Sequence, residues 1–140
     1  MKRGENGKGL ASRWYPETLR RRILDIVGLH DRLEFVHGDG LASIAANAGA
    51  PNTAFFIDPP YTGAGRRLYR HNELDHEALF ALAEGIRGDF LMTYDRTEHI
   101  VALARAHHFQ VRQVPMKTTH HARKTELVIG RNLEWLEEPL

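Results

Sequence analysis

The chain of 140 residues carries 19 lysines and arginines against 18 aspartates and glutamates, and it contains no cysteine. Disulfides, thiolate metal ligands and cysteine nucleophiles are therefore excluded. The length predicts one domain, and a content of 42% hydrophobic and 26% charged residues is typical of globular proteins. No stretch has the apolar length of a signal peptide or a membrane span, so we expect a cytoplasmic protein without membrane contact.

Hydrophobic periodicity predicts the elements of the N-terminal half. Residues 1–13 are glycine-rich and read as a loop, and a helix opens at Pro16 and fades near residues 28–31. A short strand is expected at Leu33–His37 and a short helix near residues 41–45. The apolar run Ala54–Ile57 predicts the second strand.

The C-terminal half continues the alternation. The expected elements are a helix from a cap at Asp75 to about Ile86, a strand at Phe90–Tyr94, a helix capped by Thr97 or Asp95, and strands at Phe109–Val114 and Glu126–Ile129. Strands that alternate with helices and end in two closely spaced strands predict an α/β fold with a final antiparallel pair.

The most informative segment is Asp58-Pro59-Pro60-Tyr61, directly after the apolar strand. In open α/β sheets the ligand crevice lies beyond the carboxyl ends of the strands. Prolines fix the backbone and remove amide donors, which leaves carbonyl oxygens free to accept hydrogen bonds. Asp58 and these carbonyls can accept from an amine on a flat ring while Tyr61 stacks on the ring. An ordinary turn is the alternative for these four residues.

Charge supports a polyanionic partner. Basic residues outnumber acidic ones in residues 2–22 and again in residues 112–131. Two basic clusters on either side of a neutral middle suit a nucleic acid that crosses the site. Two solvated faces would explain the same distribution.

With its surroundings, the motif resembles that of the adenine-specific DNA methyltransferases, both orphan and restriction-associated. The resemblance extends over residues 9–133 and rests on the segments 9–19, His37-Gly38-Asp39-Gly40, 55–61, 75–80, 90–95 and 125–130. It implies a Rossmann-like, S-adenosylmethionine-dependent methyltransferase fold, with a mostly parallel sheet that ends in an antiparallel hairpin. Residues 1–140 would be the C-terminal catalytic part of that domain, and residues 1–15 the tail of the target-recognition insertion.

The resemblance also implies a mechanism and site residues. An adenine rotated out of duplex DNA would stack on Tyr61 and present its amine to Asp58 and the Pro59 carbonyl. S-adenosylmethionine would supply the methyl group, and no metal is expected. Asp39 matches the position that contacts the adenine moiety of the methyl donor, with a simple turn as the alternative. The candidates for DNA contact are Arg13, Arg66, Arg123 and Lys124, for which a solvated surface role is the alternative.

The chain departs from the family in its donor-binding part. A glycine loop after a first strand and an acidic residue after a second strand are both missing. We therefore expect a protein truncated at its N-terminus, with an N-terminal donor-binding segment as a further partner. In the family, two strands separate the equivalents of Leu33–His37 and Ala54–Ile57. We expect Leu33–His37 to be displaced or to pair directly with Ala54–Ile57, because an unpaired apolar edge favours aggregation.

Other functions remain open. The same motif could act on the exocyclic amine of cytosine or on a glutamine side chain, and a fragment without the donor half could bind DNA without transferring methyl groups. The adjacent histidines at 107–108 and 120–121 lack a carboxylate at ligand spacing, so they do not predict a metal site. Neither Ser12 nor Ser43 lies in the nucleophile elbow of a serine hydrolase.

Overall fold

The computed structural model describes residues 15–60, 62, 74–117 and 123–136. The chain divides into two compact units, Met1–His37 and Gly38–Leu140, and each is considered by itself. Within the described residues, no helix is both long and apolar enough to cross a membrane.

The first unit consists of the helix α1 (Pro16–Val27) and a single 3-10 turn, η2 (His30–Arg32). Proline in the first turn and Glu17 beside it open α1 as expected, since proline lacks the amide that would have no partner there. None of the described residues of this unit is buried.

The prediction of a strand at Leu33–His37 is wrong, because these residues form no strand. Their alternating apolar residues fit a strand, but a strand also needs a neighbour to accept and donate its backbone hydrogen bonds. Of the two arrangements expected for this segment, displacement or pairing with Ala54–Ile57, the pairing is not found, because the strand bonded to Ala54–Ile57 in the described sheet is β2 (Asp89–Asp95).

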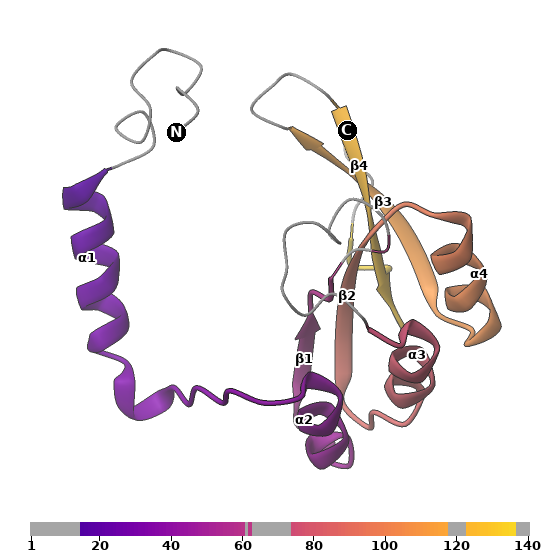
Figure 1. Ribbon diagram of the computed structural model, residues 1–140, viewed down its shortest axis with the longest axis horizontal. Helices are drawn as coiled ribbons and strands as arrows, with labels where there is room; N and C mark the ends of the chain where they lie inside the picture. Colours follow the sequence, from indigo (N-terminus) through magenta and orange to yellow (C-terminus); the bar gives the residue numbers. More distant parts are fainter. Residues whose placement is uncertain (1–14, 61, 63–73, 118–122, 137–140) are drawn as a thin grey trace. The chain divides into compact units, whose positions relative to one another are not determined.

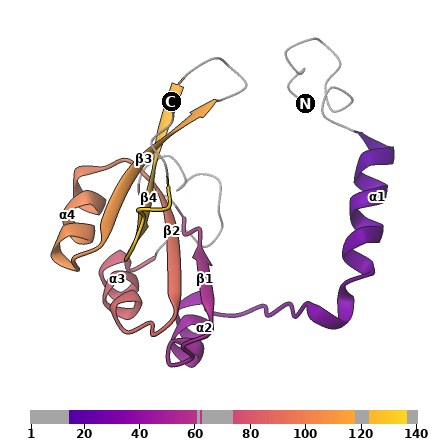
Figure 2. The same ribbon diagram turned by 180° about the vertical axis from the view of Figure 1, so that it is seen from behind.

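The second unit is an α/β unit with a four-stranded mixed sheet. The strands β1 (Ala54–Ile57), β2 (Asp89–Asp95), β3 (Gln110–Lys117) and β4 (Arg123–Gly130) lie in the order β1-β2-β4-β3 (Figure 1, and from behind in Figure 2). The strands β1 and β2 are parallel, and β4 runs antiparallel to both of its neighbours. The antiparallel final pair is thus confirmed, and β4 is the strand that reverses direction.

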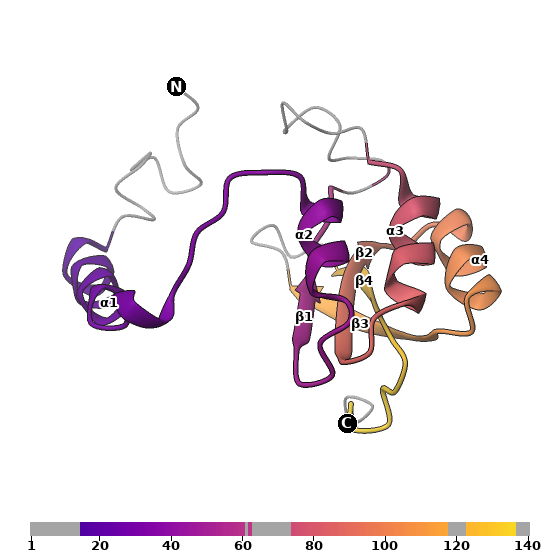
Figure 3. The same cartoon turned by 90° about the horizontal axis from the view of Figure 1, so that it is seen from below.

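Three helices of this unit, α2 (Gly40–Asn47), α3 (His76–Glu84) and α4 (Glu98–Ala106), lie side by side on one face of the sheet (Figure 3). Each begins at a side-chain cap that satisfies a free amide of the first turn. Asp39 accepts from Leu41 N–H at 2.9 Å, Asp75 from Ala78 N–H at 2.9 Å and Thr97 from Ile100 N–H at 3.3 Å. Of the two residues expected to cap α4, Thr97 is therefore the cap.

The core lies between these helices and the sheet. Alternate residues of β2 face it, so the strand reads buried at Phe90, Met92 and Tyr94 and only partly covered between them. The remaining buried members of the cluster are Leu79, Phe80, Ala83, Ile86, Ile100, Ala104, Phe109, Leu127 and Ile129. Successive side chains of a strand point to opposite faces. A shift of β2 by one residue would therefore turn Phe90, Met92 and Tyr94 away from the helices, so their burial fixes the register of this strand.

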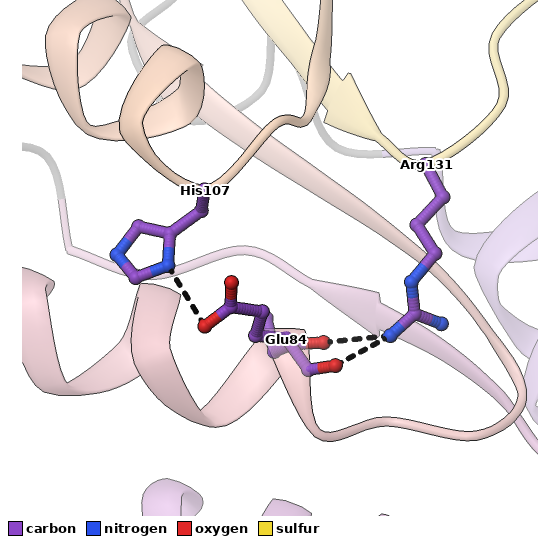
Figure 4. A network of polar contacts seen from close by, with 4 residues as sticks. Glu84, His107 and Arg131 are labelled. Atoms are coloured by element: carbon purple, nitrogen blue, oxygen red, sulfur yellow. Dashed lines mark hydrogen bonds and ion pairs between the residues drawn. The ribbon is translucent and has the colours of Figure 1, made fainter.

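Two side chains bind the C-terminal end of α3 (Figure 4). The guanidinium of Arg131 donates to the carbonyl oxygens of Ala83 (3.2 Å) and Glu84 (2.8 Å). It also donates to the carbonyl oxygen of Gly88, just beyond the helix (3.0 Å). His107 Nδ1 lies 3.3 Å from Glu84 Oε2. The last carbonyls of a helix have no donor within the helix, and Arg131 supplies one. This side chain thereby joins the end of α3 to the segment that follows β4.

Candidate active site at the ends of two parallel strands

The candidate site begins where β1 ends. Asp58 and Pro60 follow β1 directly with Pro59 between them, and Pro59 is buried while the Asp58 side chain is exposed. The register pairs Ile57 with Met92, so the next position along β1 brings Asp58 beside Thr93. Thr93 Oγ1 donates a hydrogen bond of 2.6 Å to Asp58 Oδ1. This length is typical of strong hydroxyl–carboxylate hydrogen bonds.

A second contact joins the same two segments, and here the residue of β2 is the acceptor. Asp95, the last residue of β2, accepts from the backbone N–H of Thr62 at 3.2 Å and from its hydroxyl at 3.2 and 3.4 Å. Position 61 therefore lies in the chain between two residues, Asp58 and Thr62, that are both bonded to β2. Together the two contacts hold the segment after β1 against the end of its neighbour.

Tyr94, the residue between Thr93 and Asp95, is buried on the other face of β2 and forms a hydrogen bond with His76. The Tyr94 side chain is 0% exposed, and its hydroxyl forms a 3.0 Å hydrogen bond with His76 Nδ1. Burial, with a smaller contribution from the charge of Asp95, raises the pKa of Tyr94 well above its ordinary value. The phenol is therefore neutral at physiological pH, and Tyr94 acts as a packed core residue between the helices and the strand that carries Thr93 and Asp95.

The remaining expected site residues are distributed as follows. Asp39 does not meet Asp58: its carboxylate caps α2, and its backbone carbonyl accepts from the Ser43 hydroxyl. Arg123 and Lys124 open β4, opposite Lys117 and Met116. Because Asp95 pairs with Glu126, these two basic residues extend the hairpin past the carboxyl end of β2, which is also the end of β1 that Asp58 follows. Arg13, Tyr61 and Arg66 lie outside the described residues.

Two hollows of the second unit that described residues line lie away from Asp58. One of about 320 Å³ is at the opposite end of β1 and β2, where Ala54, Asp89 and Trp135 line it. Another, of about 400 Å³, lies between α4 and β3 and is lined by Arg96 and Arg105 among others. Neither of these two hollows includes the Asp58–Thr93 pair among its lining residues.

Two residues of the site were not anticipated from the sequence, Thr93 as the partner of Asp58 and Thr62 as the partner of Asp95. A signal existed for the first. Thr93 is the polar residue within the apolar run of the expected strand at 90–94, near its carboxyl end. Comparison with family models matches no family to this chain, and comparison with curated proteins gives no match.

Proposed function

We propose that this protein is the catalytic part of an adenine-specific DNA methyltransferase of the Rossmann-like, S-adenosylmethionine-dependent class, acting in the cytoplasm. The observation that carries the proposal is the Asp58–Thr93 pair at the carboxyl ends of two parallel strands. A carboxylate held there, next to a proline whose carbonyl can accept a further hydrogen bond, suits a substrate that carries an amine.

The residues of this chain would bind and orient the base. Extrusion of an adenine from the duplex costs a few kcal/mol of free energy. Stacking of the base on Tyr61 would offset on the order of 1–3 kcal/mol of that cost. Asp58 and the Pro59 carbonyl would accept hydrogen bonds from the N6 amine, so that its lone pair points at the incoming methyl group. Holding the amine in this orientation lowers the entropic part of the barrier.

The methyl group would come from S-adenosylmethionine. Asp39 is the one described residue to which the resemblance assigns a donor contact, and its carboxylate already caps α2. A single carboxylate already engaged at a helix cap does not make a binding site for the methyl donor. Double-stranded DNA is the proposed partner. Arg123 and Lys124, which lie beyond the end of β2, would contact the phosphates of the DNA. Arg13 and Arg66 remain proposed DNA contacts, and a role in restriction-modification is one setting for this activity.

A second candidate is favoured by that incomplete donor site and by the free edge of β1. In the described sheet, β1 pairs with β2 on one side and with no strand on the other. The chain would then bind DNA and the adenine, and would transfer methyl groups after a donor-binding polypeptide pairs with that edge. S-adenosylmethionine titrated into the isolated chain would give no binding under this candidate, and binding would return when the donor-binding polypeptide is added.

The test of the proposed function measures methyl transfer to duplex DNA, with the product identified by mass spectrometry. N6-methyladenine formed by the wild-type chain, alone or with a donor-binding polypeptide, is expected. Asp58→Ala should lower the rate on the order of 100-fold, because the lost acceptor orients the reacting amine. Methylated cytosine as the product would favour the cytosine alternative. Transfer that Asp58→Ala leaves unchanged would overturn the assignment.

A further inference from the structure

The Thr93 hydroxyl is the described group that touches the Asp58 carboxylate most closely, at 2.6 Å, and it comes from a different strand, 35 residues along the chain. Resting on the function proposed above, we infer that Thr93 is a positioning residue, which fixes the orientation of Asp58 so that one carboxylate oxygen faces the substrate amine.

The first step of the argument is that the position of Thr93 is fixed. Its neighbours Met92 and Tyr94 are both 0% exposed and point into the core. Since successive side chains of a strand point to opposite faces, Thr93 must lie on the face away from the helices. A β-branched residue in a strand also has few side-chain rotamers, so the hydroxyl has a defined direction.

The second step is that Asp58 needs such a partner. Its side chain is exposed at the end of β1, and exposure leaves a carboxylate free to rotate unless a partner holds it. Two acceptor oxygens are equivalent in a free carboxylate. The bond from Thr93 to Oδ1 distinguishes them, because it occupies one oxygen and leaves Oδ2 for a donor that approaches from beyond the strand ends.

The third step is that this role differs from a contribution to stability. A hydrogen bond between two partly exposed side chains adds little to the free energy of unfolding. Its loss would be felt where orientation matters, in the ability of Asp58 to recognise an amine. Thr93→Val removes the hydroxyl and keeps the shape and strand preference of the side chain, and Thr93→Ser keeps the hydroxyl.

The experiment measures binding and needs no methyl donor. Two labelled duplexes are compared by fluorescence anisotropy with the full chain: one carries adenine opposite an abasic site, and the other carries purine, which lacks the amine, at the same position. An unpaired base is extruded at low cost, so the difference in affinity reports recognition of the amine. The wild-type chain should prefer adenine, and Thr93→Val should reduce that preference on the order of 10-fold.

Controls separate positioning from folding and from the proposed function. Thr93→Ser should restore the preference for adenine. Thr53→Val deletes a hydroxyl just before β1, at the far end of that strand, and should bind both duplexes like the wild type. Circular dichroism of each variant verifies the fold. A wild-type preference for adenine that Thr93→Val retains would overturn the positioning role and leave the proposed function intact. A wild-type chain that binds both duplexes equally would overturn both.

Where methyl transfer is measurable, a second readout applies. Loss of orientation should lower kcat in Thr93→Val and leave the KM for DNA nearly unchanged, because the phosphate contacts that dominate DNA affinity are not altered. A rise in KM with an unchanged kcat would instead point to a role in DNA binding and would contradict the inference.

Discussion

Asp95 at the end of β2 accepts hydrogen bonds from both the backbone N–H and the hydroxyl of Thr62, which lies 33 residues earlier in the chain, just past the two prolines. The bond from Thr93 to Asp58 crosses the same gap in the other direction. The segment after β1 and the carboxyl end of β2 thus each contribute one acidic residue and one threonine. The two contacts join Asp58 and Thr62 to the same strand, β2.

The Thr62–Asp95 contact should be measurable as local stability. Asp95→Ala removes the acceptor of both the Thr62 amide and the Thr62 hydroxyl, so hydrogen exchange at the Thr62 amide should accelerate on the order of 10-fold, which corresponds to the typical net value of a hydrogen bond. Thr62→Ser keeps both donors and serves as the control. An exchange rate at Thr62 that does not differ between the wild type and Asp95→Ala would show that Asp95 does not anchor this segment.

Gly88 should tolerate no side chain. A Cβ atom there would lie 1.9 Å from the carbonyl oxygen of Thr53, which also accepts a hydrogen bond from the amide of Asp89, the first residue of β2. We expect Gly88→Ala to lower the free energy of unfolding by roughly 1–3 kcal/mol or more, since neither backbone can yield without losing this hydrogen bond.

Gly85 offers a matched control for Gly88. Gly85 caps the C-terminal end of α3 with φ of −79°. A Cβ atom added there would lie 3.4 Å from its nearest neighbour, the carbonyl oxygen of Leu82. Gly85→Ala should therefore be close to neutral, within about 1 kcal/mol of the wild type. Urea denaturation of the two variants decides the matter, and equal midpoints for both would show that the approach of Thr53 to Gly88 is not tight in solution.

Much of the second unit could be predicted from local sequence. β1 has the expected bounds, and Asp75 and Thr97 cap their helices, because capping and periodicity are set within a few residues. Leu33–His37 shows where local reasoning ends: its alternation fits a strand, but pairing depends on a neighbour elsewhere in the chain. The partners of Asp58 and Asp95 were missed for the same reason, since they follow from the register of strands that are more than 30 residues apart.

Tyr94 should make the stability of the fold sensitive to alkaline pH. Its pKa is raised in the folded state, chiefly by burial, so above about pH 10 the unfolded chain loses the phenol proton while the folded chain keeps it. The unfolded state then binds fewer protons, and the free energy of unfolding falls with rising pH, by about 1.4 kcal/mol per pH unit for one such group.

Tyr94→Phe isolates this contribution. The variant loses the hydrogen bond to His76 and should be less stable at neutral pH by about 1 kcal/mol. Its stability should decline less steeply than that of the wild type between pH 10 and about pH 11, because no buried phenol is left to ionise on unfolding. Urea unfolding at several pH values measures both slopes. Parallel curves for the two proteins would contradict a raised pKa of Tyr94.

The free edge of β1 should promote self-association of the isolated chain. The strand contains no lysine, proline or other residue that commonly protects an edge, and the Phe56 side chain is 70% exposed. We expect Phe56→Lys to reduce association in sedimentation velocity experiments over a range of concentrations. Phe35→Lys is the matched control, since Phe35 is 90% exposed and lies in a segment that forms no strand. If exposed apolar area alone drives association, both variants will reduce it; if the edge of β1 drives it, Phe56→Lys will act and Phe35→Lys will not. A concentration series in which Phe56→Lys sediments like the wild type would rule out the edge as the contact.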